Sequence, residues 1–124
     1  MVRTLILIGI GGGIGSILRY VTTLFANRLF ATIFPIGTFA VNFVGCLLIG
    51  VFMGLFEKQQ LISSDWRALL VVGLCGGYTT FSSFTSESVS LFQADNTMTS
   101  FLYIGGSVIL GLFDTWLGLS LTRL

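Results

Sequence analysis

The stretch GGYTTFSSFTSE, residues 76–87, gathers side chains and backbone features that could bind an ion. Gly76 and Gly77 stand together in an apolar run, and each glycine weakens a helix by about 1 kcal/mol. A helix that breaks there frees backbone carbonyls, which can coordinate a cation inside a membrane. The alternative is a helix interface, in which the glycines pack closely and the following threonine hydroxyls bond to the preceding turn. These residues alone leave both interpretations open.

Two phenylalanines follow, and they indicate a different ion chemistry. Phe81 and Phe84 lie three residues apart on one helix face, with Ser82 and Ser83 beside them. An aromatic ring has a positive edge, so it can face an anion without carrying a full charge. Rings and hydroxyls along one helix could therefore line a narrow path for a small, hard anion. Such a pair is also common in a core or against lipid, and Glu87 could face either water or a pore vestibule.

Three further polar groups stand inside apolar stretches, where each one needs a reason. Asn42 shares a helix face with Thr38 and Cys46, because the three are spaced by four residues. Its amide could bond a neighbouring helix or point two N–H donors into the bundle. Arg19 could reach the membrane interface or bond carbonyls near the break. Asp114 could pair with Arg19 or lie near the surface, and the sequence does not decide between them.

The composition requires membrane-spanning helices to carry these groups. The chain has 124 residues, of which 54% are hydrophobic and 9% are charged, whereas soluble domains carry about 25% charged residues. A chain this small cannot hide so much apolar surface from water. A spanning helix needs about 20 mainly apolar residues, and the charge-poor runs predict spans over 4–25, 36–56, 67–92 and 98–121. The expected fold is one all-α membrane domain over 1–124, in which the third helix is either broken near its middle or continuous through a close helix interface.

Small residues recur at four-residue spacing, which lets helices approach closely in lipid. This pattern predicts a close-packed bundle or a dimer face. Cys46 and Cys75 are expected to be small packing residues rather than a disulfide or a zinc pair. The spaced pairs are Gly9/Gly13, Gly11/Gly15, Gly50/Gly54 and Ser107/Gly111.

Basic residues are spread over both sides of the predicted membrane. The side with both termini carries four basic residues, Arg3, Lys58, Arg67 and Arg123. The other side carries two, Arg28 and the more deeply placed Arg19. The positive-inside rule places both termini in the cytoplasm, but so weak a bias permits insertion in both orientations. The net charge is +1, without a basic patch, which argues against nucleic acid as a partner.

Three segments resemble the signature blocks of the CrcB/Fluc family of fluoride channels. They are GGGIGSILRY (11–20), GTFAVNFVGC (37–46) and GLCGGYTTFSSFTSE (73–87), and the third is the most specific. The resemblance extends over nearly the whole chain in length and number of spans. It implies an antiparallel, dual-topology homodimer in the cell membrane, whose subunits have a third helix broken near its middle. It also implies two fluoride pathways and a structural sodium ion at the dimer centre. The implied function is passive efflux of fluoride, which protects the cytoplasm.

The resemblance also implies roles for individual residues. The sodium ion would be held by the backbone carbonyls of Gly76 and Thr79. The fluoride pathway would be lined by Asn42, Phe81, Phe84, Ser82 and Ser83, continued by Thr115, with Arg19, Thr80 and Glu87 as supporting residues. The fourth span, GGSVILGLFDTWLG, departs most from the family, because relatives often have a hydroxyl near Gly111 and the charge of Asp114 is unexpected there.

Three other classes of protein fit the sequence less well. A small multidrug-resistance-type antiporter also has four short helices and a weak topology bias. It needs a buried carboxylate in its first span, however, and the first span here has none. A purely structural membrane protein would not explain residues 76–87. An intramembrane hydrolase would need a histidine base, and the chain contains no histidine, so we do not expect an enzyme.

Overall fold

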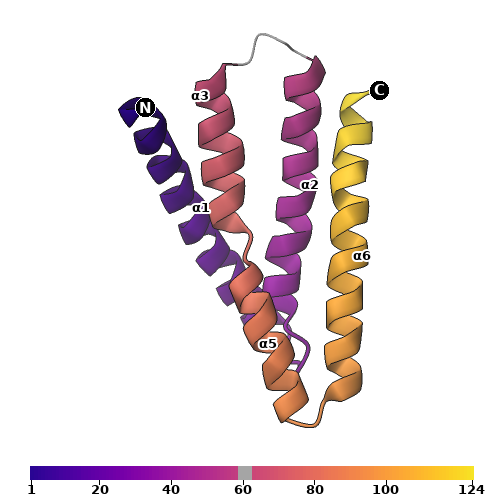
Figure 1. Cartoon of the computed structure of the whole chain (residues 1–124). Coiled ribbons are helices and arrows are strands. Elements are labelled where there is room, and N and C mark those ends of the chain that lie inside the picture. The colour runs from indigo at the N-terminus through magenta and orange to yellow at the C-terminus, as the bar shows by residue number, and fades with distance from the viewer. Residues whose placement is uncertain (59–62) are drawn as a thin grey trace.

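The computed structural model describes residues 1–58 and 63–124, which form a bundle of long helices (Figure 1). Four helical segments of this described part, 2–29, 36–58, 64–93 and 97–122, are long and apolar enough to cross a membrane. Each begins and ends within four residues of the predicted span. The elements are α1 (Val2–Leu29), α2 (Ile36–Lys58), α3 (Ser64–Arg67), the π-helix η1 (Ala68–Cys75), α4 (Gly76–Tyr78), α5 (Phe81–Gln93) and α6 (Thr97–Thr122).

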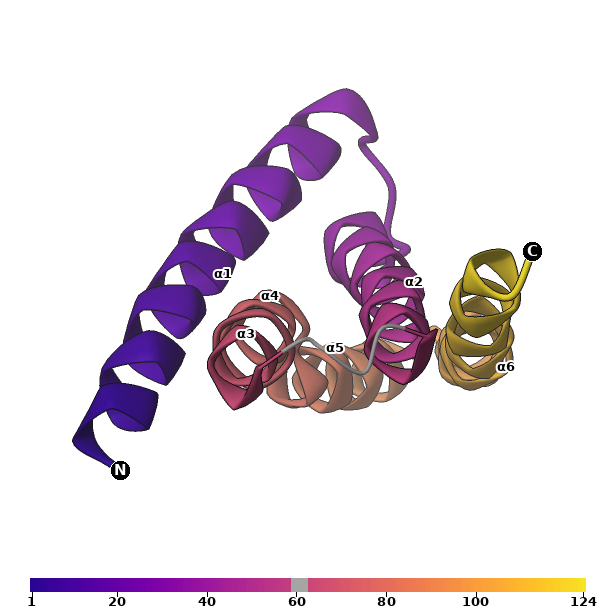
Figure 2. The same ribbon diagram turned by 90° about the horizontal axis from the view of Figure 1, so that it is seen from above.

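The helices are arranged so that both termini lie at one end of the bundle (Figure 1). The turns that follow α1 and α5 lie at the other end, as predicted. Viewed along the bundle, α1 and α6 lie on opposite sides, with α2 and the third span between them (Figure 2). The third span consists of α3, η1, α4 and α5, and its first half packs against α1. The other extensive contact is that of α2 with α6.

The third span breaks at Thr79 and Thr80, whose backbones are extended (φ −79°, ψ 157° and φ −147°, ψ 122°). The predicted break near the middle of this span is confirmed, but its expected position at the glycine pair was wrong. Gly76 is helical, with φ −62° and ψ −38°. The physical reason is that Gly77 allows close packing of the third span against α1 and does not interrupt the helix. A Cβ added to Gly77 would lie 2.5 Å from the carbonyl oxygen of Gly12.

Glycines in α1 also allow the third span to approach closely. A Cβ on Gly11 would collide with the carbonyl of Leu69, and a Cβ on Gly15 would collide with that of Leu74. Gly9 and Gly13 lie on another face, because a Cβ on either would meet nothing within 4 Å in the described structure. One of the two predicted glycine pairs in α1 therefore forms the contact between α1 and the third span.

The contact between α2 and α6 is equally close. A Cβ on Gly50 would collide with the carbonyl of Thr115, and a Cβ on Gly54 with the hydroxyl of Thr122. From the other side, a Cβ on Gly118 would lie 2.5 Å from the carbonyl oxygen of Leu47. The glycine pair predicted in the second span is thus confirmed as a packing surface. Cys46 and Cys75 are both free thiols.

Candidate functional site

The break in the third span is held from α2 by the side chain of Asn42. Its Oδ1 accepts a hydrogen bond from the backbone N–H of Thr80 at 2.8 Å, and its Nδ2 donates to the backbone carbonyl of Thr80 at 3.0 Å. An asparagine amide carries two N–H donors, so one donor of Asn42 remains for another partner. The same side chain therefore fixes the extended backbone and keeps a donor at the break.

The hydroxyl of Thr80 begins the second half of the span. It accepts a hydrogen bond from the backbone N–H of Ser83 at 3.2 Å and lies 3.3 Å from the hydroxyl of Ser82. Thr80 is thus the N-cap of α5, a position that threonine favours. The N-terminus of a helix carries partial positive charge from its unpaired N–H groups, and α5 places that end at the break.

The break also releases backbone carbonyls, among them those of Gly76 and Thr79. In a continuous helix, Gly76 would accept from the N–H of Thr80, and Thr79 would accept from the N–H of Ser83. Both N–H groups bond elsewhere, to Asn42 and to the Thr80 hydroxyl. The carbonyls of Gly76 and Thr79 are therefore available to another ligand, and carbonyl oxygens suit hard cations. These are the two residues at which the family resemblance implies a sodium site.

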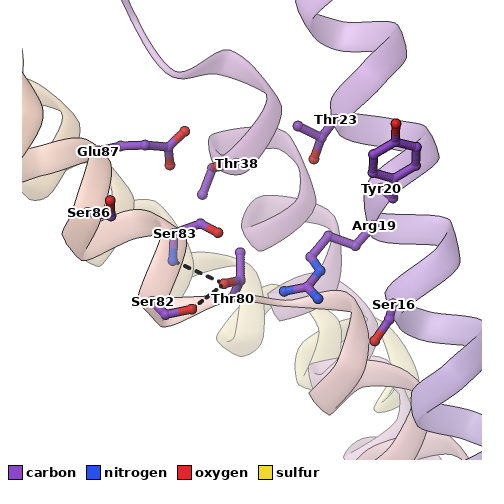
Figure 3. Close-up of a pocket in the computed structure, with 10 residues that line it drawn as sticks. All are labelled: Ser16, Arg19, Tyr20, Thr23, Thr38, Thr80, Ser82, Ser83, Ser86 and Glu87. Atoms are coloured by element: carbon purple, nitrogen blue, oxygen red, sulfur yellow. Dashed lines mark hydrogen bonds between the residues drawn. The ribbon is translucent and has the colours of Figure 1, made fainter.

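A polar pocket of about 690 Å³ lies beside the break, between α1, α2 and α5 (Figure 3). Arg19 extends from α1 toward Thr80, and Glu87 lies on the opposite side near Thr38 (Figure 3). The pocket brings together five of the predicted residues, Arg19, Thr80, Ser82, Ser83 and Glu87. It is completed by Ser16, Tyr20, Thr23, Thr38 and Ser86, which the predicted site did not include.

A second pocket of about 240 Å³ shares Thr80 with the first, because this residue lines both. It holds the two predicted phenylalanines, whose ring centroids are 5.7 Å apart with an angle of 42° between the rings. Phe81 is 75% exposed, so its ring lies on a surface that the rest of the chain leaves open. The pocket is lined by Asn42, Cys46, Thr79, Thr80, Phe81, Phe84, Ser107 and Val108.

Tyr103 and Ser107 on α6 were not predicted as site residues. Tyr103 is 0% exposed, donates its hydroxyl to Glu87 Oε1 at 3.2 Å, and packs its ring 5.2 Å from that of Phe84. It therefore joins a wall of the polar pocket to the phenylalanine pair. Both residues belong to a four-residue spacing, Tyr103, Ser107, Gly111 and Thr115, which places them on one face of the fourth span. That spacing was the sequence signal from which both residues could have been predicted.

Thr115 and Asp114, the two remaining polar residues considered from the sequence, lie between α2 and α6. The hydroxyl of Thr115 donates to the carbonyl of Cys46 at 3.2 Å, and Thr115 lines neither of the two pockets. Asp114 is 1% exposed, so it does not lie near the surface. Nor does it pair with Arg19, since the ion pairs of the described residues are Arg3–Asp65 and Arg123–Glu57. Both positions considered for Asp114 were wrong.

The fold and the site define a class of multi-pass membrane protein in which a broken third helix places hydroxyls, ring edges and free carbonyls together. Residues 6–119 match the family model described as "CrcB-like protein, Camphor Resistance (CrcB)". The match covers most of the chain, and the chain belongs to this family.

Individual relatives are similar over almost their entire length. A protein of Flavobacterium psychrophilum, named "Fluoride-specific ion channel FluC", is 50% identical over 121 residues, which are 98% of each chain. A protein of Phocaeicola vulgatus with the same name is 49% identical over 94% of this chain and 96% of its own. Another of that name, from Azobacteroides pseudotrichonymphae, is 43% identical over 99% of this chain and 98% of its own.

Proposed function

We propose that this protein is a fluoride-selective ion channel that lets fluoride leave the cell passively. The observation that carries the proposal is the pair of pockets that share Thr80, one rich in hydroxyls and the other containing Phe81 and Phe84. Relatives up to 50% identical are named fluoride-specific channels. Proton-coupled cation exchange has no comparable support, because the first span carries no carboxylate.

The main physical difficulty is the removal of water from a small anion, which costs tens of kcal/mol when nothing replaces the water. The chain offers replacement donors in the free N–H of Asn42, the hydroxyls of Ser82 and Ser83, and the ring edges of Phe81 and Phe84. These donors are neutral, so the ion is bound weakly enough to leave. A narrow, rigid path excludes the larger chloride ion by size.

A structural sodium ion would be held by the carbonyls of Gly76 and Thr79. When bound, it supplies positive potential close to the anion path. The support is that both carbonyls have lost their usual helical donors to Asn42 and Thr80. Replacement of sodium by a large organic cation during purification should lower the thermal stability of the protein. Readdition of sodium, but not of more organic cation, should restore that stability, and equal stability in both salts would contradict this site.

An antiparallel second copy would complete the site. Gly76 is exposed, and a Cβ on it would approach only the carbonyl of Val71, at 3.8 Å. Phe81 is exposed on the same span. A second subunit would cover both residues, and the weak bias of four basic residues against two fits insertion in both orientations. Native mass spectrometry of the purified protein should give a dimer, and a C-terminal tag should be accessible from both sides of the cell membrane.

A cellular experiment tests the proposed function directly. Expression in a bacterial strain that lacks its own fluoride exporter should restore growth on fluoride and lower the fluoride content of the cells. The matched control is the same strain with Phe81→Ile, expressed at an equal level in the membrane. Growth no better than that of the empty vector, with wild-type protein present in the membrane, would contradict the proposal.

A further inference from the structure

Asp114 on α6 is an acidic side chain in an apolar setting. It is 1% exposed, and its Oδ2 is buried without a hydrogen-bond partner among the described residues. It lies eight residues before Thr122, where α6 ends, which is about 12 Å along the helix axis. That depth places it inside the apolar part of the span, where an ionised carboxylate needs a compensating charge.

The basic residues of the chain do not supply that charge. The chain has six of them. Arg3 and Arg123 form ion pairs with other carboxylates. Lys58 donates to a backbone carbonyl at the end of α6, and Arg67 lies over a phenylalanine ring. Arg19 and Arg28 lie on α1.

The elements packed against α6 do not supply it either. On α2, the titratable residue at this level is Cys46, whose carbonyl accepts a hydrogen bond from Thr115, the neighbour of Asp114. A thiol carries no positive charge. On α5 the titratable group is Glu87, which bonds Tyr103 eleven residues before Asp114. The backbones of α2 and α6 touch at Gly50 and Gly118, and Asp114 lines neither pocket at the break. The contact therefore leaves little space for a hydrated cation.

We propose that Asp114 is a proton-binding site, and that a neutral carboxylic acid rather than a carboxylate lies between α2 and α6. A buried acidic group without a counter-charge becomes neutral by taking up a proton. The bound proton keeps a negative charge out of the bundle. In a channel for an anion this also removes a repulsive field, a consequence that rests on the proposed function, whereas the protonation itself does not.

Infrared spectroscopy of the purified protein in liposomes at neutral pH tests this site without any mutation. Aspartate labelled with carbon-13 at the side-chain carboxyl shifts the bands of aspartates alone. The chain has three aspartates; Asp65 is paired with Arg3 at 2.9 Å, and Asp95 is exposed in the turn before α6. We expect a carboxylic-acid carbonyl band that shifts with the label. A label that shifts carboxylate bands only, with or without sodium, would overturn the proposal.

Matched variants assign the band and separate the two proposals. Asp114→Asn should abolish the acid band, and Asp95→Asn should leave it in place. If Asp114→Asn does not fold, the infrared spectrum of the labelled wild-type protein still tests the proton site. Fluoride efflux from Asp114→Asn should stay close to that of the wild type, because the amide resembles the neutral acid. An acid band in a protein that does not conduct fluoride would support the proton site and contradict the channel, so the two failures are distinguishable.

Discussion

Asn42 on α2 holds the backbone of Thr80 in the third span through two hydrogen bonds, one accepted at 2.8 Å and one donated at 3.0 Å. The two residues are 38 positions apart in the sequence. A helix break inside a membrane exposes backbone groups that must find partners within the protein. One side chain satisfies both backbone groups of Thr80, so the stability of the break and the geometry of the site depend on the same residue.

Asn42→Ala should lower both conduction and stability. Loss of the amide leaves the N–H and the carbonyl of Thr80 unpaired, which we expect to cost about 1–3 kcal/mol in the free energy of unfolding. A barrier higher by about 1.4 kcal/mol lowers flux about tenfold, and we expect at least that loss in fluoride efflux. The control is Asn96→Ala, since Asn96 precedes α6 without a side-chain capping bond. Wild-type efflux from Asn42→Ala would show that the paired bonds are dispensable.

Phe81→Ile should reduce fluoride efflux while the protein remains folded and dimeric. Phe81 is 75% exposed, so its replacement removes a ring edge from the path with little loss of packing within the chain. Phe101→Ile is the matched control, because Phe101 is 59% exposed on α6 and lines neither pocket. Liposome efflux and size-exclusion chromatography measure the two properties. Unchanged flux in a folded Phe81→Ile protein would contradict the role of this ring.

Thr80→Val and Thr80→Ser separate the hydroxyl of Thr80 from its shape. Valine keeps the shape but cannot accept the hydrogen bond from the Ser83 N–H, and the loss of an N-cap costs about 1 kcal/mol. We expect lower thermal stability and lower fluoride efflux for Thr80→Val. Thr80→Ser keeps the hydroxyl and should recover most of both. A loss in Thr80→Ser together with wild-type behaviour of Thr80→Val would mean that the methyl group, and not the cap, is what matters.

Gly118→Ala and Gly105→Ala test the close contact between α2 and α6. A Cβ on Gly118 would lie 2.5 Å from the carbonyl oxygen of Leu47 and 2.7 Å from the backbone nitrogen of Val51. Overpacking of this kind costs about 1–3 kcal/mol. A Cβ on Gly105 would meet nothing within 4 Å, so Gly105→Ala should be neutral or stabilising by up to about 1 kcal/mol. Denaturant unfolding in detergent compares them, and equal stability would refute the close contact.

The four spans and the existence of the break follow from the sequence because both depend on local properties. Apolar runs of spanning length predict the helices. The composition of residues 76–87 allows an interruption or a helix interface, and the family resemblance favours the interruption. The position of the break does not follow, because it depends on a contact between distant residues. Gly77 stays helical against Gly12 on α1, and the extended backbone falls instead where Asn42 can reach Thr80.

The predicted site residues on the third span lie close together for the same reason, since one helix carries them past the break. The residues on α6 were harder to predict, because their roles depend on which neighbour they face. Thr115 faces Cys46 on α2, Tyr103 faces Glu87 on α5, and Asp114 lies buried against α2. A four-residue spacing identifies a shared face, but it does not show what that face contacts.

Ion efflux from liposomes that contain the purified protein tests the central claim most directly. Fluoride and chloride electrodes follow the release of each ion from identical vesicles, with protein-free liposomes as the control. The account predicts fast fluoride release and no chloride release above the control. Equal release of both ions, or no fluoride release from a folded dimer, would contradict it.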